Sequence, residues 1–249
     1  MKQQIKTTEA IFPMPVLLIS TFNEDGSVDV MNAAWGTMLD RDMVALNLTE
    51  THRTVQNIKA RKGFVIHLAD AKHVVEADWF GVVSGGKVAD KFERSGMTFV
   101  RSELVDAPII NELPVAIECE FVEYQSDNTG LGVIGKVLRT SVEEANMKDG
   151  KLDIDSLEAI AFDPYTHGYY KVGGRVGEAF RDGYVAADLA AVLQDPVIRS
   201  MSREQVEKMV EEDRRRMKKS AADLDFAEAA RYRDEMWALQ EYLKVWKDR

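Results

Sequence analysis

The stretch MVALNLTETHRTVQNIKARKGFVIHLA, residues 43–69, decides the fold because its hydrophobic period changes twice. Large apolar side chains recur at every second position in its first part, which predicts a strand. A helical rhythm follows over residues 52–62, and Gly63 stands where a glycine commonly ends a helix. The apolar run GFVIHLA then predicts a second strand. Strand, helix and strand therefore follow one another within this stretch.

The junction between the first strand and the helix, TETHRTVQNI at residues 49–58, is crowded with polar side chains. A helix N-terminus attracts anions because its free N–H groups and its dipole point there. Arg53 adds a guanidinium fork that binds phosphate oxygens in pairs. Further hydroxyl donors are Thr49, Thr51 and Thr54. A plain threonine cap beside a solvated arginine has the same pattern, so the spacing alone leaves a phosphate site and a cap equally open.

Other strand-like apolar runs lie on both sides of this stretch. They are PVLLIS (15–20), VDVMNAAW (28–35), VAIECEFVEY (115–124), LGVIGKVLRT (131–140) and GYYKVGG (168–174). At least six strands with few helices between them favour an antiparallel barrel with helical excursions. A parallel sheet would need a more regular alternation of strands and helices. We therefore expect a mainly β, α+β fold.

Composition excludes several classes of protein. The 249 residues are 45% hydrophobic and carry a net charge of −10, which argues against general nucleic-acid binding. The sequence has neither a signal-peptide pattern nor an apolar run long enough to span a membrane, so a cytoplasmic location is expected. Cys119 is the single cysteine, which fits a reducing compartment. No histidine or cysteine pair has the spacing of metal ligands, so we expect no metal site.

The C-terminal end differs from the rest of the chain. Residues 202–249 hold 12 Lys/Arg and 12 Asp/Glu and no proline, so residues 1–201 carry the whole net charge. Apolar side chains recur there at helical intervals in two series, which break near Leu224-Asp225-Phe226. This predicts a helical hairpin. We divide the chain into a barrel over 1–183, a linker over 184–201 and a hairpin over 202–249.

Five segments, taken in order, resemble the flavin reductase-like, FMN-binding split-barrel family, and flavoredoxin-type members in particular. They are PVLLIST…GSVDVMNAAWGT, the stretch at 43–69, SGGKVADKFERSGM, NELPVAIECEF and YYKVGGRVGEAF. The resemblance implies a six-stranded split barrel that forms a homodimer and binds FMN non-covalently near the dimer interface. One departure is the turn LDRDM, where many relatives carry a proline pair, so the resemblance does not carry over contacts to the flavin ring at that turn.

The resemblance also assigns residues to the cofactor. One strand would line the isoalloxazine ring, the helix start would hold the phosphate, and the segment around SGGKVADK would close over the flavin. Trp35 could equally be an aromatic residue of the core instead of contacting the flavin. Lys91 could equally be a solvated lysine on a helix instead of contacting the flavin. The residues implied are Asn32, Ala33, Ala34, Trp35, Thr37, Thr49, Thr51, Arg53, Thr54, Asn57, Ser84, Gly85 and Lys91.

The tail resembles the UVR motif, a helical hairpin of bacterial excision-repair proteins, over residues 206–243. The Leu-Asp-Phe turn, the double alanine and the Arg-Asp pair of that motif are all present in LDFAEAARYRD. The resemblance implies contact with a protein partner. Packing of the hairpin on its own barrel or on a dimer mate is at least as open, because a hairpin of this size has little core of its own.

The expected function is that of an FMN-dependent oxidoreductase that receives electrons from NAD(P)H or from a protein donor. The sequence has no G-x-G-x-x-G after a strand, so a nicotinamide would have to stack directly over the flavin. No catalytic residue is assigned, because hydride transfer requires no acid or base. The alternative is a non-enzymatic barrel, with or without flavin, that presents the hairpin to a protein partner.

Overall fold

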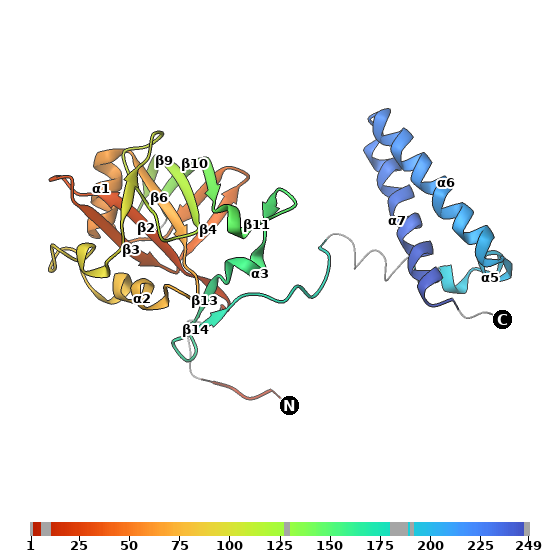
Figure 1. Cartoon of the computed structure of the whole chain (residues 1–249), viewed down its shortest axis with the longest axis horizontal. Helices are drawn as coiled ribbons and strands as arrows, with labels where there is room; N and C mark the ends of the chain where they lie inside the picture. The colour runs from red at the N-terminus through yellow and green to blue at the C-terminus, as the bar shows by residue number, and fades with distance from the viewer. Residues whose placement is uncertain (1, 6–10, 127–129, 180–188, 190–191, 247–249) are drawn as a thin grey trace. The chain divides into compact units, whose positions relative to one another are not determined.

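The computed structural model describes residues 2–5, 11–126, 130–179, 189 and 192–246. The chain divides into two compact units, residues 1–174 and 175–249, which are drawn with their elements in Figure 1. Part of the predicted linker over 184–201 lies outside the described residues.

The first unit is built on a seven-stranded sheet with the order β3-β2-β6-β9-β10-β5-β4, in which every neighbouring pair is antiparallel. It curls into a split barrel. Its strands are β2 (Leu17–Phe22), β3 (Val28–Ala33), β4 (Gly36–Asp40), β5 (Met43–Leu46), β6 (Gly63–Leu68), β9 (Val115–Gln125) and β10 (Gly132–Val142). This confirms the predicted mainly β, α+β split barrel.

Smaller elements surround the main sheet. Three strands form a sheet of their own: β1 (Met14–Pro15), β13 (Ile160–Asp163) and β14 (Gly168–Lys171). Two hairpins pair β7 (Phe99–Arg101) with β8 (Pro108–Ile110) and β11 (Met147–Lys148) with β12 (Lys151–Leu152). The helices are α1 (Arg53–Arg61), α2 (Val74–Val82) and α3 (Ile154–Leu157), with short 3₁₀ turns at Glu93–Ser95 and Glu144–Asn146.

Apolar side chains pack on both faces of the sheet. Leu18 belongs to a cluster that includes Phe80 of α2, and Ile19 belongs to a second cluster that includes Ile58 of α1. Consecutive residues of a strand point to opposite faces, so the two helices cover opposite faces of the sheet (Figure 1). This explains why β2 is buried along its whole length.

The structure corrects two details of the sequence prediction. The main sheet has seven strands instead of six, because Gly36–Asp40 forms an edge strand that pairs with β5. That strand is mostly exposed, so it lacks the apolar alternation that marks a half-buried strand. The left-handed residue that ends α1 is Lys62, and Gly63 already belongs to β6.

The second unit is a helical hairpin preceded by a short helix. Its helices are α5 (Pro196–Ser200), α6 (Arg203–Ala222) and α7 (Phe226–Lys244). Asp225 caps α7 by accepting a hydrogen bond from the backbone N–H of Glu228 at 3.1 Å. Val206, Met236 and Leu239 form its core with their neighbours. Among the described helices of the chain, none is long and apolar enough to cross a membrane.

Candidate functional site

A cleft of about 630 Å³ opens where the end of β3, the segment after β5 and the small sheet of β13 and β14 meet. This volume lies within the range of sites that bind cofactors and other small molecules. The lining residues are Val16, Met31, Asn32, Ala33, Ala34, Trp35, Asn47, Leu48, Thr49, His52, Phe162 and Tyr169. Five of the residues predicted from the sequence therefore meet here: Asn32, Ala33, Ala34, Trp35 and Thr49.

One end of the cleft is the N-terminus of α1. His52 is the residue before the first helical turn, and among the described residues no side chain caps that turn and no acidic side chain lies within it. Thr51, His52 and Arg53 are exposed. The helix therefore offers uncapped N–H donors beside a cationic side chain, which is the arrangement that binds anions.

Two other predicted phosphate residues are already engaged inside the protein. Thr54 is buried and donates from Oγ1 to Oδ2 of Asp29 over 2.6 Å. Asn57 is also buried and donates from Nδ2 to Thr21 Oγ1 at 3.1 Å and to Asn23 Oδ1 at 2.9 Å. Both side chains therefore hold α1 against the sheet, and neither lines the cleft.

The segment after α2 is anchored by Lys91. Its buried ammonium donates to the carbonyl of Val30 at 2.8 Å and to that of Phe80, in the last turn of α2, at 2.9 Å. A cation at this position stabilises the C-terminal end of the helix dipole. Burial lowers the pKa of Lys91 below its ordinary value. The solvated position considered for Lys91 is therefore not what the structure has.

The remaining residues predicted for this segment lie apart from the cleft lining. Ser84 is exposed, and its backbone carbonyl accepts hydrogen bonds from the N–H groups of Lys87 and Val88. Gly85 lies so close to Asp29 that an added Cβ would stand 2.5 Å from its Oδ1, so a larger residue would require a local shift. The segment therefore packs against Asp29 of β3 and does not line the cleft.

Trp35 separates the main cleft from a second one. Its side chain is 51% exposed, so it is not the core aromatic that the sequence left open. The second cleft has a volume of about 490 Å³, and none of its lining side chains is charged. It contains Thr37 together with Ala34, Trp35 and Asn47 of the shared wall.

Several lining residues were not singled out from the sequence. Phe162 and Tyr169 face each other across β13 and β14 and reach the cleft from far along the chain. Asn47, Leu48 and His52 flank the predicted threonines. The segment YYKVGGRVGEAF marked the region of Tyr169, but strand periodicity does not indicate which face of β14 meets the cleft.

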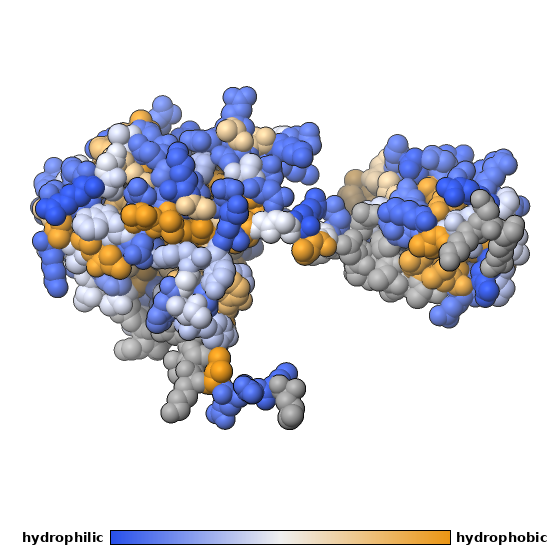
Figure 2. Space-filling model, turned by 60° about the horizontal axis from the view of Figure 1, so that its bottom comes forward, coloured by the Kyte–Doolittle hydropathy of each residue, from blue (hydrophilic) through white to orange (hydrophobic). Residues whose placement is uncertain are grey.

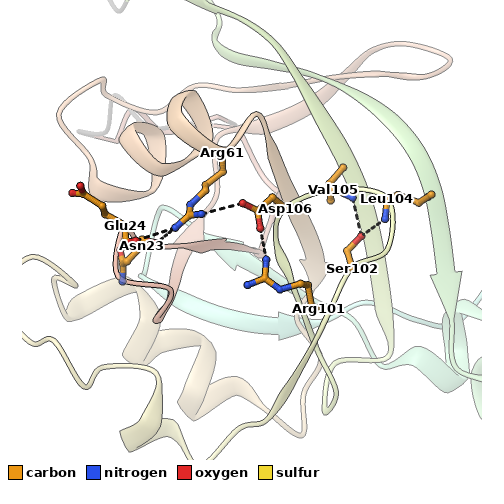
Figure 3. A network of polar contacts seen from close by, with 8 residues as sticks. All are labelled: Asn23, Glu24, Arg61, Arg101, Ser102, Leu104, Val105 and Asp106. Carbon is orange, nitrogen blue, oxygen red and sulfur yellow. Dashed lines mark hydrogen bonds and ion pairs between the residues drawn. The ribbon is translucent and has the colours of Figure 1, made fainter.

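The opposite end of α1 is held by a polar network, drawn in Figure 3. Arg61 pairs with Asp106 Oδ2 at 3.1 Å and donates to the carbonyls of Asn23 and of Glu24, the latter at 3.2 Å. Asp106 also pairs with Arg101 of β7. The network joins α1, the turn between β2 and β3, and the loop between β7 and β8, so the helix is fixed at the end distant from the cleft.

Comparison with known proteins matches one short stretch of the chain to a set of relatives of its own. A stretch of 49 residues is 49% identical to UvrABC system protein B of Cytophaga hutchinsonii, which is 20% of this chain. The chain spans only 7% of the length of that relative. The match supports the UVR-like hairpin over a short segment and carries nothing from the rest of that protein.

The first unit has relatives of its own size. Flavoredoxin of Desulfovibrio vulgaris (Miyazaki F) is 31% identical, with a TM-score of 0.69 over 74% of this chain and 100% of that one. Flavoredoxin from Methanosarcina acetivorans is 26% identical, with a TM-score of 0.65 over 73% of this chain and 98% of that one. Residues 9–157 match the flavin reductase like domain. The chain therefore belongs to the flavin reductase-like family.

Proposed function

We propose that the protein is an oxidoreductase that binds FMN in the cleft between β3 and the N-terminus of α1. The single observation that carries the proposal is the position of that N-terminus: it is uncapped, it carries Arg53, and it forms one end of the cleft. A flavin ring needs a largely apolar slot, whereas its phosphate needs N–H and cationic donors. Apolar lining side chains in the cleft and the uncapped N-terminus of α1 at one end of it support this proposal.

Different residues would hold the two parts of the cofactor. The chain from Asn32 to Trp35 would lie along the ring, and Thr49, Thr51 and Arg53 would hold the phosphate. We leave Thr54 out of this set because its hydroxyl is already bonded to Asp29. Thr54 and Asn57 would instead position the helix that carries the phosphate site.

FMN, when bound, supplies a ring that accepts electrons and passes them to a second substrate. The protein binds the ring, orients it and limits its contact with water. We propose NAD(P)H as the electron donor, with a donor protein as the alternative. The sequence has no dinucleotide-binding fingerprint, so the nicotinamide would have to reach the ring through the open side of the cleft.

The direct test is to identify the ligand that copurifies with the protein. A yellow preparation with a flavin absorption band, and a released ligand with the mass of FMN, would support the proposal. Colourless protein that takes up no FMN on titration would leave the alternative, a ligand-free barrel that presents the hairpin. Oxidation of NADH or NADPH by the loaded protein would then identify the donor.

We also propose that the first unit forms a homodimer. Trp35, Met38 and Leu39 are exposed beside the cleft, and β4 is an edge strand of the main sheet. Apolar areas interrupt the hydrophilic surface of this unit on the face shown in Figure 2. Exposed apolar side chains along a sheet edge are typical of an interface. Light scattering coupled to size-exclusion chromatography would test this, and a monomer would contradict it.

For the hairpin we propose a protein partner. Leu224 and Phe226 at its tip are 74% and 66% exposed, although both are large and apolar. Leu224 is held in the left-handed backbone region at φ 60°, which is uncommon for a leucine. Removal of residues 202–249 should leave the flavin content unchanged. Loss of flavin on this deletion would instead indicate that the hairpin supports the flavin site.

A further inference from the structure

Polar contacts tie three distant segments together at one end of the cleft. Tyr169 of β14 donates its phenol hydrogen to Asp78 Oδ1 of α2 over 2.9 Å. Asn32 of β3 donates from Nδ2 to the carbonyl of Ala77 over 2.8 Å. The side-chain amide of Asn32 also lies beside the phenol, where it acts to lower the pKa of Tyr169. Because Tyr169 and Asn32 both line the cleft, these contacts form a polar wall.

The direction of each hydrogen bond decides what this wall offers to a ligand. The carbonyl of Ala77 only accepts, so the nitrogen of Asn32 faces it and the oxygen of Asn32 keeps its capacity to accept. The carboxylate of Asp78 also only accepts, so the phenol hydrogen of Tyr169 is committed to it. One lone pair of the phenol oxygen remains beside the contact with Asn32. The wall therefore offers hydrogen-bond acceptors.

The surroundings of Tyr169 keep its phenol protonated. Burial, together with the hydrogen bond to Asp78 and its negative charge, raises the pKa of Tyr169 to about 12. The phenol therefore stays protonated at neutral pH. The negative charge of Asp78 lies next to the phenol. The wall therefore disfavours a ligand that presents a negative charge to it and favours a ligand that presents an N–H donor.

We infer that Tyr169, oriented by Asp78, is a positioning residue that accepts a hydrogen bond from an amide or imide N–H of a planar ring in the cleft. The inference rests on the proposed function, since it concerns a ring bound at that site. Two sources can supply this chemistry: the imide N–H of the flavin and the carboxamide of a nicotinamide donor.

Asp78→Asn tests the inference with almost no change in shape. The new amide can donate to the phenol oxygen, which releases the phenol hydrogen and turns the acceptor into a donor. FMN and N3-methyl FMN, which lacks the imide N–H, are titrated against both proteins. If the flavin is the source, the preference for FMN should shrink roughly 3- to 10-fold, the effect of one hydrogen bond.

The carboxamide source has its own assay. We compare the wild-type protein with Asp78→Asn by the ratio of two KM values. One is the KM for NADH, and the other is the KM for its 3-acetylpyridine analogue, which lacks the amide N–H. If the nicotinamide carboxamide donates the N–H to Tyr169, the preference for NADH over this analogue should shrink in Asp78→Asn, and the preference for FMN should not. Tyr169→Phe removes the acceptor and should shrink the same preference as Asp78→Asn does.

Tyr170→Phe is the matched control. Tyr170 is the next residue on β14, it is exposed, and its ring packs on Phe12 at 5.8 Å, so the variant should keep both preferences. Wild-type protein that binds no FMN would overturn the proposed function and this inference together. If FMN binds and neither preference changes in the Asp78 or Tyr169 variant, the proposed function stands and the role of Tyr169 is wrong.

Discussion

The two ends of helix α1 are built in opposite ways. At the C-terminal end, Arg61 bonds to Asp106 and to the backbone carbonyls of Asn23 and Glu24. At the N-terminal end, Arg53 has neither a hydrogen bond nor an ion pair within the described part of the chain, and no side chain caps the first turn. Two arginines on one short helix thus serve different purposes: one is committed to the fold, and the other is available to a ligand.

The difference shows how a binding site can be rigid and open at once. Arg61, Thr54 and Asn57 attach α1 to three neighbouring segments, so the helix is held in place by contacts that do not involve the groups at its N-terminus. Those groups can stay uncapped and still be held in place. A site arranged in advance loses less entropy when a ligand binds. The comparison predicts that changes at the two ends affect different quantities.

Acid should destabilise the fold that holds both ends of α1, and we expect this to be the largest effect on stability. His67 of β6 is fully buried, and burial lowers its pKa to about 4. In the unfolded chain its pKa is near 6.5, so the neutral form stabilises the fold above that value. This contribution is lost as pH falls from 6.5 towards 4, by about 3 kcal/mol of unfolding free energy in total. Urea unfolding at several pH values measures it.

His67→Gln is the control for the acid effect. The variant cannot titrate, so its stability should depend less steeply on pH between 6.5 and 4.5. An equally steep dependence in the variant would show that other groups cause the loss.

Loss of Arg53 should act on binding alone. Arg53→Ala removes a charge-assisted contact to phosphate, which is worth about 1.5–3 kcal/mol, or roughly a 10- to 150-fold increase in the Kd for FMN. Titration with FMN measures this, and the urea midpoint should not change. Lys59→Ala is the matched control: it removes one positive charge from the same helix, at a surface pair with Glu50. Equal weakening in both variants would argue against a specific phosphate contact.

Loss of Arg61 should act on stability instead. Arg61→Ala leaves two backbone carbonyls and part of Asp106 without their partner, so we expect a loss of about 1–2 kcal/mol of unfolding free energy. The Kd for FMN should change less than about threefold, which is below the effect of one good hydrogen bond. Urea unfolding and FMN titration of the same preparation give both values. If Arg61→Ala greatly weakened FMN binding and left the free energy of unfolding unchanged, the two ends of α1 would not differ in the way proposed.

Thr54 should behave like Arg61 although it lies one residue from Arg53. Thr54→Val keeps the shape and removes the hydrogen bond to Asp29, at a cost of about 1 kcal/mol of stability. Thr54→Ser keeps the hydroxyl and should recover most of it. If Thr54→Val lowers FMN affinity as much as Arg53→Ala does, Thr54 contacts the phosphate after all.

Much of the fold followed from local patterns. The change of period within residues 43–69 predicts a strand, a helix and a returning strand, and the structure has all three in that order. The seventh strand escaped prediction because its side chains are mostly exposed. The polar start of α1 was also found from the sequence, since helix N-termini and arginine have a known affinity for anions.

The division of labour among the polar residues could not be predicted from the sequence. Thr49, Thr51 and Thr54 look alike in the sequence. Only Thr54 is buried, where its hydroxyl donates to the carboxylate of Asp29 on β3. Tyr169 and Asp78 are far apart along the chain and meet only because the fold brings β14 against α2. Such contacts depend on the packing of whole elements, which periodicity does not encode.

We propose that the free N-terminal end of α1 holds the phosphate of FMN. The most direct measurement compares the Kd of FMN with that of riboflavin, which lacks the phosphate, in the wild-type protein and in Arg53→Ala. We predict that the wild-type protein prefers FMN strongly and that the variant loses most of this preference while its affinity for riboflavin stays the same. Equal affinity of the wild-type protein for the two flavins would contradict the claim.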